Sequence, residues 1–126
     1  MTSTRARLGL FAAMLVIVAG GSAATAGYGF RNSMRLAQPV ALPGVVLYSG
    51  SYSFEVMDPW EKVNIVRISS IDSHRLRYAG FARRVPRPPS LPPNSIFTFG
   101  EVRPGEPVPI TAWFPLGEKY GHEFIR

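Results

Sequence analysis

Five arginines follow one another closely in the middle of the chain and form its strongest chemical signal. They fall within 13 residues that include no acidic side chain, and Tyr78 and Phe81 lie among them. The five are Arg75, Arg77, Arg83, Arg84 and Arg87. Guanidinium groups pair with phosphate and carboxylate groups, and interleaved aromatic rings stack on bases, so this composition favours an anionic partner. The alternative is a solvated strand face whose arginine stems cover apolar neighbours.

Trp60 is a second candidate for contact with a partner. It follows Asp58 and Pro59, a pair that is typical of turns. Trp60 therefore belongs either to the core or to an exposed turn, and an exposed tryptophan is a common contact residue in interfaces. We add it to the five arginines as a candidate contact with a partner or an anionic surface.

The residue types needed for catalysis are present, but their order does not favour it. Asp72, Ser73 and His74 supply an acid, a nucleophile and a base, yet adjacent residues of a loop or strand point in different directions and cannot form a triad among themselves. The sequence has no Gly-x-Ser-x-Gly elbow, glycine-rich phosphate loop or His-Glu-x-x-His motif. We predict a non-enzymatic protein with no catalytic residue and no cofactor.

Metal binding has equally little support in the sequence. The chain contains two histidines, His74 and His122, and no cysteine, so a site would have to recruit a ligand such as Met57. Nothing in their spacing brings these residues together, and we predict no metal site.

The positive charge of the chain is unevenly distributed. Fourteen basic and eight acidic residues give a formal net charge of +6. Residues 1–35 contain four arginines and no acid, hence +4, whereas residues 36–126 contain ten basic and eight acidic residues, hence +2. Most of the net charge therefore belongs to the N-terminal segment and says little about binding by the rest of the chain.

Residues 1–30 are predicted to form a transmembrane or signal helix. From Leu8 to Phe30 there are 23 residues without a charge, and Arg5 and Arg7 precede them. At about 1.5 Å per residue, a helix of this length crosses a hydrocarbon core of about 30 Å. The same span also has the charged start and apolar centre of a secretory signal peptide.

Two fates of this helix remain open. As an uncleaved anchor, it would cross the membrane once and pack on a partner helix through the small residues Gly20, Gly21 and Ala24. As a signal peptide, it would be cleaved after Ala26, and the mature chain would begin at Gly27. Either fate places the remainder outside the cytoplasm, at the cell membrane or secreted, which argues against nucleic acid as a partner.

Residues 31–43 have the composition of a tether, and residues 44–126 that of an extracytoplasmic β domain. Beyond the tether, apolar residues recur at every second position, as at Tyr52, Phe54 and Val56. Turn-forming residues separate seven short segments: 44–49, 51–57, 62–68, 74–83, 95–102, 107–115 and 118–125. The sequence leaves no room for crossover helices, which disfavours a parallel sheet.

We therefore predict an all-β fold, a seven-stranded antiparallel β-sandwich, with a small barrel as the alternative. The predicted core takes the apolar residues of the segments, among them Phe54, Val63, Ile65 and Leu76. A domain of this size is marginal, but the apolar residues are numerous enough for it to fold without disulfides.

The order of the parts resembles a known class of module. An apolar N-terminal helix precedes a pair of strands, and the turn Arg103-Pro104-Gly105-Glu106 leads directly into an alternating strand. This arrangement, over residues 45–125, is similar to the immunoglobulin-like or fibronectin-III-like extracytoplasmic modules that high-GC Gram-positive bacteria attach to single-pass membrane proteins. The resemblance implies an antiparallel sandwich and a role in adhesion, scaffolding or as an accessory subunit, and it carries over no catalytic residue.

Two hypotheses about function follow. In the first, the protein is a single-pass membrane protein whose extracytoplasmic β-sandwich acts by protein–protein contact, as an accessory subunit beside a membrane-protein partner. In the second, it is a secreted binding module, cleaved after Ala26, that recognises an acidic lipid or wall polymer through the arginine patch.

Overall fold

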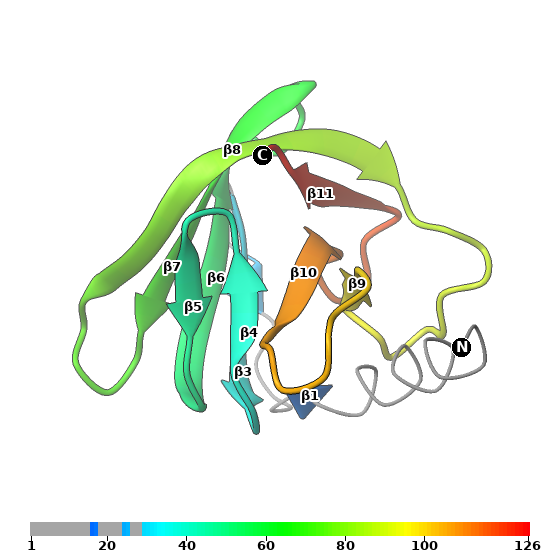
Figure 1. Cartoon of the computed structure of the whole chain (residues 1–126). Coiled ribbons are helices and arrows are strands. Elements are labelled where there is room, and N and C mark those ends of the chain that lie inside the picture. Colours follow the sequence, from blue (N-terminus) through cyan, green and yellow to red (C-terminus); the bar gives the residue numbers. More distant parts are fainter. Residues whose placement is uncertain (1–15, 18–23, 26–28) are drawn as a thin grey trace.

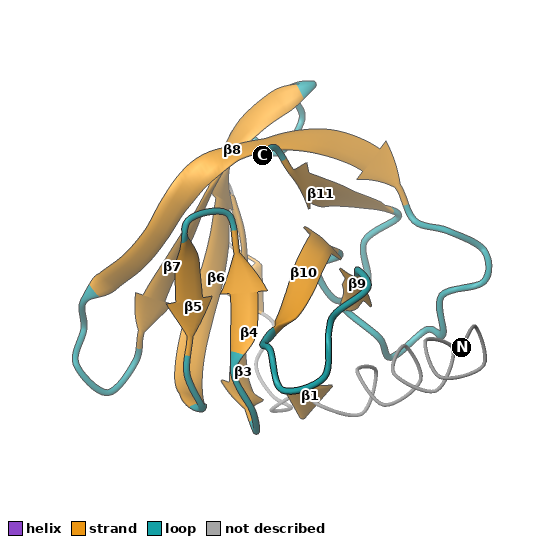
Figure 2. Ribbon diagram, viewed as in Figure 1, coloured by secondary structure: helices purple, strands orange, loops and turns teal. Residues whose placement is uncertain are grey.

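In the computed structural model, the described part of the chain comprises residues 16–17, 24–25 and 29–126. These residues form eleven strands and no helix, and all the strands belong to one mixed sheet (Figure 2). The prediction of an all-β fold is therefore confirmed for the described residues.

The sheet is built from strands of two to eleven residues. In chain order they are β1 (Val16–Ile17), β2 (Ala24–Thr25), β3 (Gly29–Leu36), β4 (Val40–Leu42), β5 (Val45–Leu47), β6 (Gly50–Met57), β7 (Val63–Ser70), β8 (Leu76–Pro86), β9 (Phe97–Phe99), β10 (Val108–Trp113) and β11 (Tyr120–Phe124).

Along the sheet the order is β1-β3-β6-β7-β8-β11-β10-β4-β5, with β2 beside β3 and β9 beside β10. Figure 1 shows the long strand β8 arching over the molecule, so that it joins the β3-β6-β7 side to the β11-β10 side. All pairs are antiparallel except β10 with β4, where Val108 lies opposite Val40 in a parallel pair. This pair makes the sheet mixed, unlike the purely antiparallel sandwich that we predicted.

All seven predicted segments contain a strand, β5 to β11. The turn before β10 also forms as the sequence indicates. The Glu106 amide donates to the Arg103 carbonyl (3.1 Å), and Gly105 has a φ of 85°. Pro104 fixes the first central residue of such a turn, and glycine is favoured at the second because its φ is positive.

The predicted tether is part of the sheet. Within residues 31–43, β3 pairs along its whole length with β6, and β4 pairs with β5 and β10. The physical reason is that Asn32, Met34 and Leu36 alternate with exposed or half-buried residues and point into the core, as strand residues do.

The predicted N-terminal helix lies mainly outside the described residues, as do Gly20 and Gly21. The described pieces of residues 1–30 are β1, β2 and the start of β3. Ala24, which we expected on a helix face, belongs to β2 and lies opposite Arg31. Among the described residues there is no helix with the length and hydrophobicity needed to cross a membrane.

Aromatic side chains from distant strands form the centre of the core. Phe54 of β6 contacts Phe97 of β9 and Trp113 of β10, with ring centroids 5.3 and 5.5 Å apart. The Trp113 indole N–H donates to the buried Asn32 side chain of β3 (3.2 Å), which also accepts the Leu116 amide (3.1 Å). These contacts join the two sides of the sheet.

One strand has the opposite phase to the one we predicted. On β7 the inward residues are Asn64, Val66 and Ile68, whereas Val63 and Ile65 are exposed. The prediction that these two residues lie in the core is wrong, and so is the same prediction for Leu76. A shift of one position moves every side chain of a strand to the other face, so the outer face of the sheet gains apolar residues.

Candidate functional site

The five arginines do not form one patch. Arg83 and Arg84 are neighbours on β8 and therefore point to opposite faces of the sheet. On the outer face, Arg83 lies opposite Glu123 of β11 and forms an ion pair with it (3.1 Å). On the inner face, Arg84 lies opposite His122 of the same strand.

The other three arginines lie at the two ends of β8 and make different contacts. Arg87 donates to the carbonyl of Ser95 (2.8 Å) and to that of Pro92, so it holds the proline-rich loop that follows β8. Arg75 and Arg77 are exposed at the opposite end of β8, where the Ser70 amide donates to the Arg75 carbonyl (2.8 Å). Of the predicted contact residues, the fold brings together Arg84 and Trp60.

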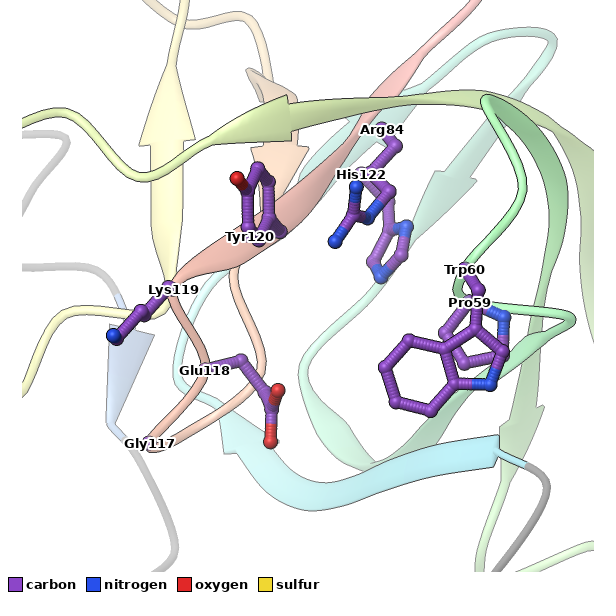
Figure 3. A pocket seen from close by; sticks show the side chains of 8 residues that line it. All are labelled: Pro59, Trp60, Arg84, Gly117, Glu118, Lys119, Tyr120 and His122. Atoms are coloured by element: carbon purple, nitrogen blue, oxygen red, sulfur yellow. The ribbon is translucent and has the colours of Figure 1, made fainter.

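Trp60 and Arg84 line a cavity of about 350 Å³ between the β6–β7 turn and β11. We call it the Trp60 pocket. Figure 3 shows its eight lining residues, which are Pro59, Trp60, Arg84, Gly117, Glu118, Lys119, Tyr120 and His122. The Trp60 side chain is 66% exposed, so its indole is accessible at this site.

Arg84 is held in place by an aromatic ring. Its guanidinium carbon lies 3.7 Å from the centroid of the Tyr120 ring, a close cation–π contact. Lys119, next to Tyr120, brings a second positive charge to the pocket and Glu118 a negative one. Among the described residues, neither Arg84 nor Lys119 forms an ion pair.

His122 forms the buried wall of the pocket. Only 2% of the residue is exposed, and burial, together with the Arg84 charge, lowers its pKa to about 4. Its Nδ1 lies 3.1 Å from Oδ1 of Asn64, whose amide nitrogen donates to the Glu61 carbonyl (3.1 Å). Because Asn64 Oδ1 is an acceptor, the network assigns the proton of the neutral imidazole to Nδ1.

The remaining nitrogen, Nε2, consequently presents a lone pair. It makes no hydrogen bond to a described residue, and it is not fully buried. In Figure 3 the imidazole points into the space bounded by Trp60 and Glu118. The pocket therefore combines two cations, two acceptors and an accessible aromatic face, and this set suits binding of a polar ligand.

The sequence analysis missed most of this pocket. His122 was considered only as a candidate metal ligand, and nothing in the sequence indicated that it is buried. Its burial depends on Asn64, which is 58 residues away in the chain. Glu118, Lys119 and Tyr120 carry no distinctive spacing, so no signal in the sequence singles them out.

A second feature lies on the outer face of the sheet. Met57, Ile65 and Phe81 are directly opposite one another on β6, β7 and β8. Beside them are Ile125, whose amide donates to the Phe81 carbonyl (3.1 Å), and Val63. We call these five residues the outer patch; Phe81 is 61% and Val63 53% exposed.

Charged side chains border the outer patch. On one side Arg31 pairs with Glu55 (3.0 Å), and on the other Arg83 pairs with Glu123. Arg67, opposite Glu55 on β7, is exposed and forms no ion pair with a described residue. An apolar centre with a charged border is the usual composition of an interface.

Comparisons of the chain with protein-family models, with curated proteins and with solved structures give no significant match.

Proposed function

We propose that this protein is a non-enzymatic, extracytoplasmic module that acts by protein–protein contact through the outer patch. The observation that carries the proposal is the set of exposed apolar side chains on adjacent strands. Full burial of a side chain of the size of valine or phenylalanine contributes about 1.5–3 kcal/mol, so a partner that covers Phe81 and Val63 gains several kcal/mol.

The partner that fits this surface has an apolar centre and an acidic border. Arg67 adds a positive charge on one side of the outer patch. The two ion pairs at the border are neutral, so the excess charge is positive. Complementary charges fix orientation and speed association, and an acidic border on the partner matches this excess.

The N-terminal segment supports a location at the membrane. If it is an anchor, it ends before β3 begins at Gly29, which leaves the 21 residues Leu8 to Tyr28. The short strands β1 and β2, which pair with β3, would then have to leave the sheet and become helical. At about 1.5 Å per residue this still covers a hydrocarbon core of about 30 Å. With β3 directly after the span, the outer patch would stay close to the bilayer, as expected of an accessory subunit beside a membrane-protein partner.

Cleavage after Ala26 is the second fate and is compatible with the same contact. The mature chain would begin at Gly27, two residues before β3, and would keep the whole strand. Mass spectrometry of the N-terminus of the native protein distinguishes the two. The basic start and the uncharged span of residues 1–30 are what supports export in both cases.

The experiment places a photoreactive phenylalanine analogue at position 81 of the full chain, in the membranes of its host. We expect an ultraviolet-dependent cross-link to one other membrane protein, which Ile65→Glu or Val63→Glu abolishes. Leu76→Glu is the matched control, because Leu76 is an exposed apolar residue of the same strand, about 16 Å along it. Circular dichroism of each variant verifies its fold.

Three results would refute the proposal. They are the absence of a cross-link, a cross-link that Leu76→Glu abolishes equally, and a cross-link only between copies of this chain. The third would replace the partner protein by a homodimer.

A second candidate function is recognition of an acidic ligand. The predicted patch of five arginines cannot serve it as a unit, since Arg83 and Arg84 face opposite sides of the sheet. What favours the function is Arg84 alone, together with the Trp60 pocket that it lines.

A further inference from the structure

We propose that the Trp60 pocket binds a hexuronate unit, that is, a pyranose sugar that carries a carboxylate. This inference develops the second candidate function and does not depend on the outer patch. It rests on the kinds of groups that line the pocket and on how the fold orients them.

The two cations call for an anionic group on the ligand. Arg84 is oriented by the ring of Tyr120, so its guanidinium loses little freedom on binding. Lys119 lines the same cavity. Because neither has an ionic partner among the described residues, a ligand carboxylate would not have to displace a protein carboxylate from them.

The two acceptors call for hydroxyl groups on the same ligand. The tautomer of His122 leaves Nε2 as an acceptor, and the Glu118 carboxylate accepts hydrogen bonds only. Inorganic phosphate brings only one or two hydroxyl donors at neutral pH, and Glu118 would repel its charge. A sugar hydroxyl donates to either atom, so the pocket requires hydroxyls as well as a negative charge.

The aromatic surface and the size of the pocket complete the set. The exposed indole of Trp60 offers a flat face whose negative electrostatic potential attracts the C–H groups of a pyranose ring. The volume of about 350 Å³ is at the lower end of the range of about 300–1,000 Å³ for ligand sites. A hexuronate has the carboxylate, the hydroxyls and the ring face in one small unit.

The test is calorimetric titration of trigalacturonate into the full chain, with maltotriose as the neutral control and inorganic phosphate as the anion control. We expect trigalacturonate to bind, salt to weaken the binding, and both controls to bind at least about tenfold more weakly. Parallel titration of free galacturonate distinguishes a free sugar acid from a polymer, since a polymer site prefers the trisaccharide.

The matched pair of variants is Arg84→Gln and Arg83→Gln. These residues are adjacent on β8 but point into the pocket and onto the outer face, respectively. We expect Arg84→Gln to weaken trigalacturonate binding by about tenfold or more and Arg83→Gln to change it by less than about twofold. Trp60→Phe should reduce the fluorescence change on binding, because Trp60 lines the pocket whereas Trp113 is fully buried behind His122 (ring centroids 5.6 Å apart).

Four results would overturn the proposal. They are no binding of trigalacturonate, equal binding of maltotriose, equal binding of phosphate, and equal weakening by the two arginine variants. The outcome is also independent of the outer patch: Phe81→Glu should leave the titration unchanged, and Arg84→Gln should leave the cross-link at position 81 unchanged.

Discussion

The free energy of unfolding should fall between pH 7 and pH 5 because His122 is neutral in the folded protein. Burial and the Arg84 charge lower its pKa to about 4, whereas a histidine in the unfolded chain has a pKa of about 6.5. A lowered folded-state pKa means that the unfolded chain takes up the proton first. The contribution is therefore complete above pH 6.5 and is lost as the pH falls towards 4.

The size of the effect follows from the two pKa values. Each pH unit between them costs about 1.4 kcal/mol, and the onset near pH 6.5 is gradual. From pH 7 to pH 5 the expected loss from this residue is about 2 kcal/mol. Since small domains have unfolding free energies of about 5–15 kcal/mol, such a loss is easily measured.

The assay is urea denaturation of the full chain at pH 7 and pH 5, compared with His122→Asn. Asparagine keeps an N–H donor for Asn64 but does not titrate. The variant therefore separates the effect of protonating the imidazole from the effect of losing the hydrogen bond. We expect the loss between the two pH values to be about 2 kcal/mol larger in the unmodified protein than in the variant. Changes at carboxylates occur in both proteins and cancel.

The reasoning about His122 is wrong if both proteins lose the same free energy between pH 7 and pH 5. A direct measurement protects the test against a variant that does not fold. The imidazole signals of His122 in a nuclear magnetic resonance titration should keep their neutral positions at pH 5, and a midpoint near 6.5 would contradict the burial argument as well.

Two further predictions concern side chains that join distant segments. Asn32→Ala removes the acceptor for the Trp113 indole and the Leu116 amide, and should lower the free energy of unfolding by about 2–4 kcal/mol in urea denaturation; a loss below about 1 kcal/mol would contradict this role. Arg87→Gln removes the guanidinium that donates to the Ser95 carbonyl, and should speed amide hydrogen exchange at the four non-proline residues of the loop (90, 91, 94 and 95) at nearly constant global stability. Unchanged exchange would show that the Arg87 contact does not order the loop.

The sequence predicted which segments become strands better than it predicted how they join. Alternation and turn residues located all seven strands from β5 to β11 because both signals are local. The tether was the exception. Pro39 and Pro43 made residues 31–43 look unstructured, but they flank β4 and leave it free to pair, while Met34 and Leu36 bury β3.

The phase of β7 could not be predicted from its own residues. Val63 and Ile65 are apolar in one phase and Val66 and Ile68 in the other, so alternation alone favours neither. The polar residue that decides the phase is Asn64, and it is buried because His122 supplies its hydrogen bond. A contact between residues 58 positions apart is invisible to any local pattern.

The division of the arginines, in contrast, follows from the period of a strand. Adjacent residues of β8 must face opposite sides, so Arg83 and Arg84 could never have shared a surface. The same rule acts on β11, where His122 faces inward and Glu123 outward. On these two adjacent strands, Arg84 and His122 thus supply a wall of the Trp60 pocket, and their chain neighbours Arg83 and Glu123 supply a border of the outer patch. Since these surfaces lie on opposite faces of the sheet, a hexuronate in the pocket would leave the outer patch open to its partner.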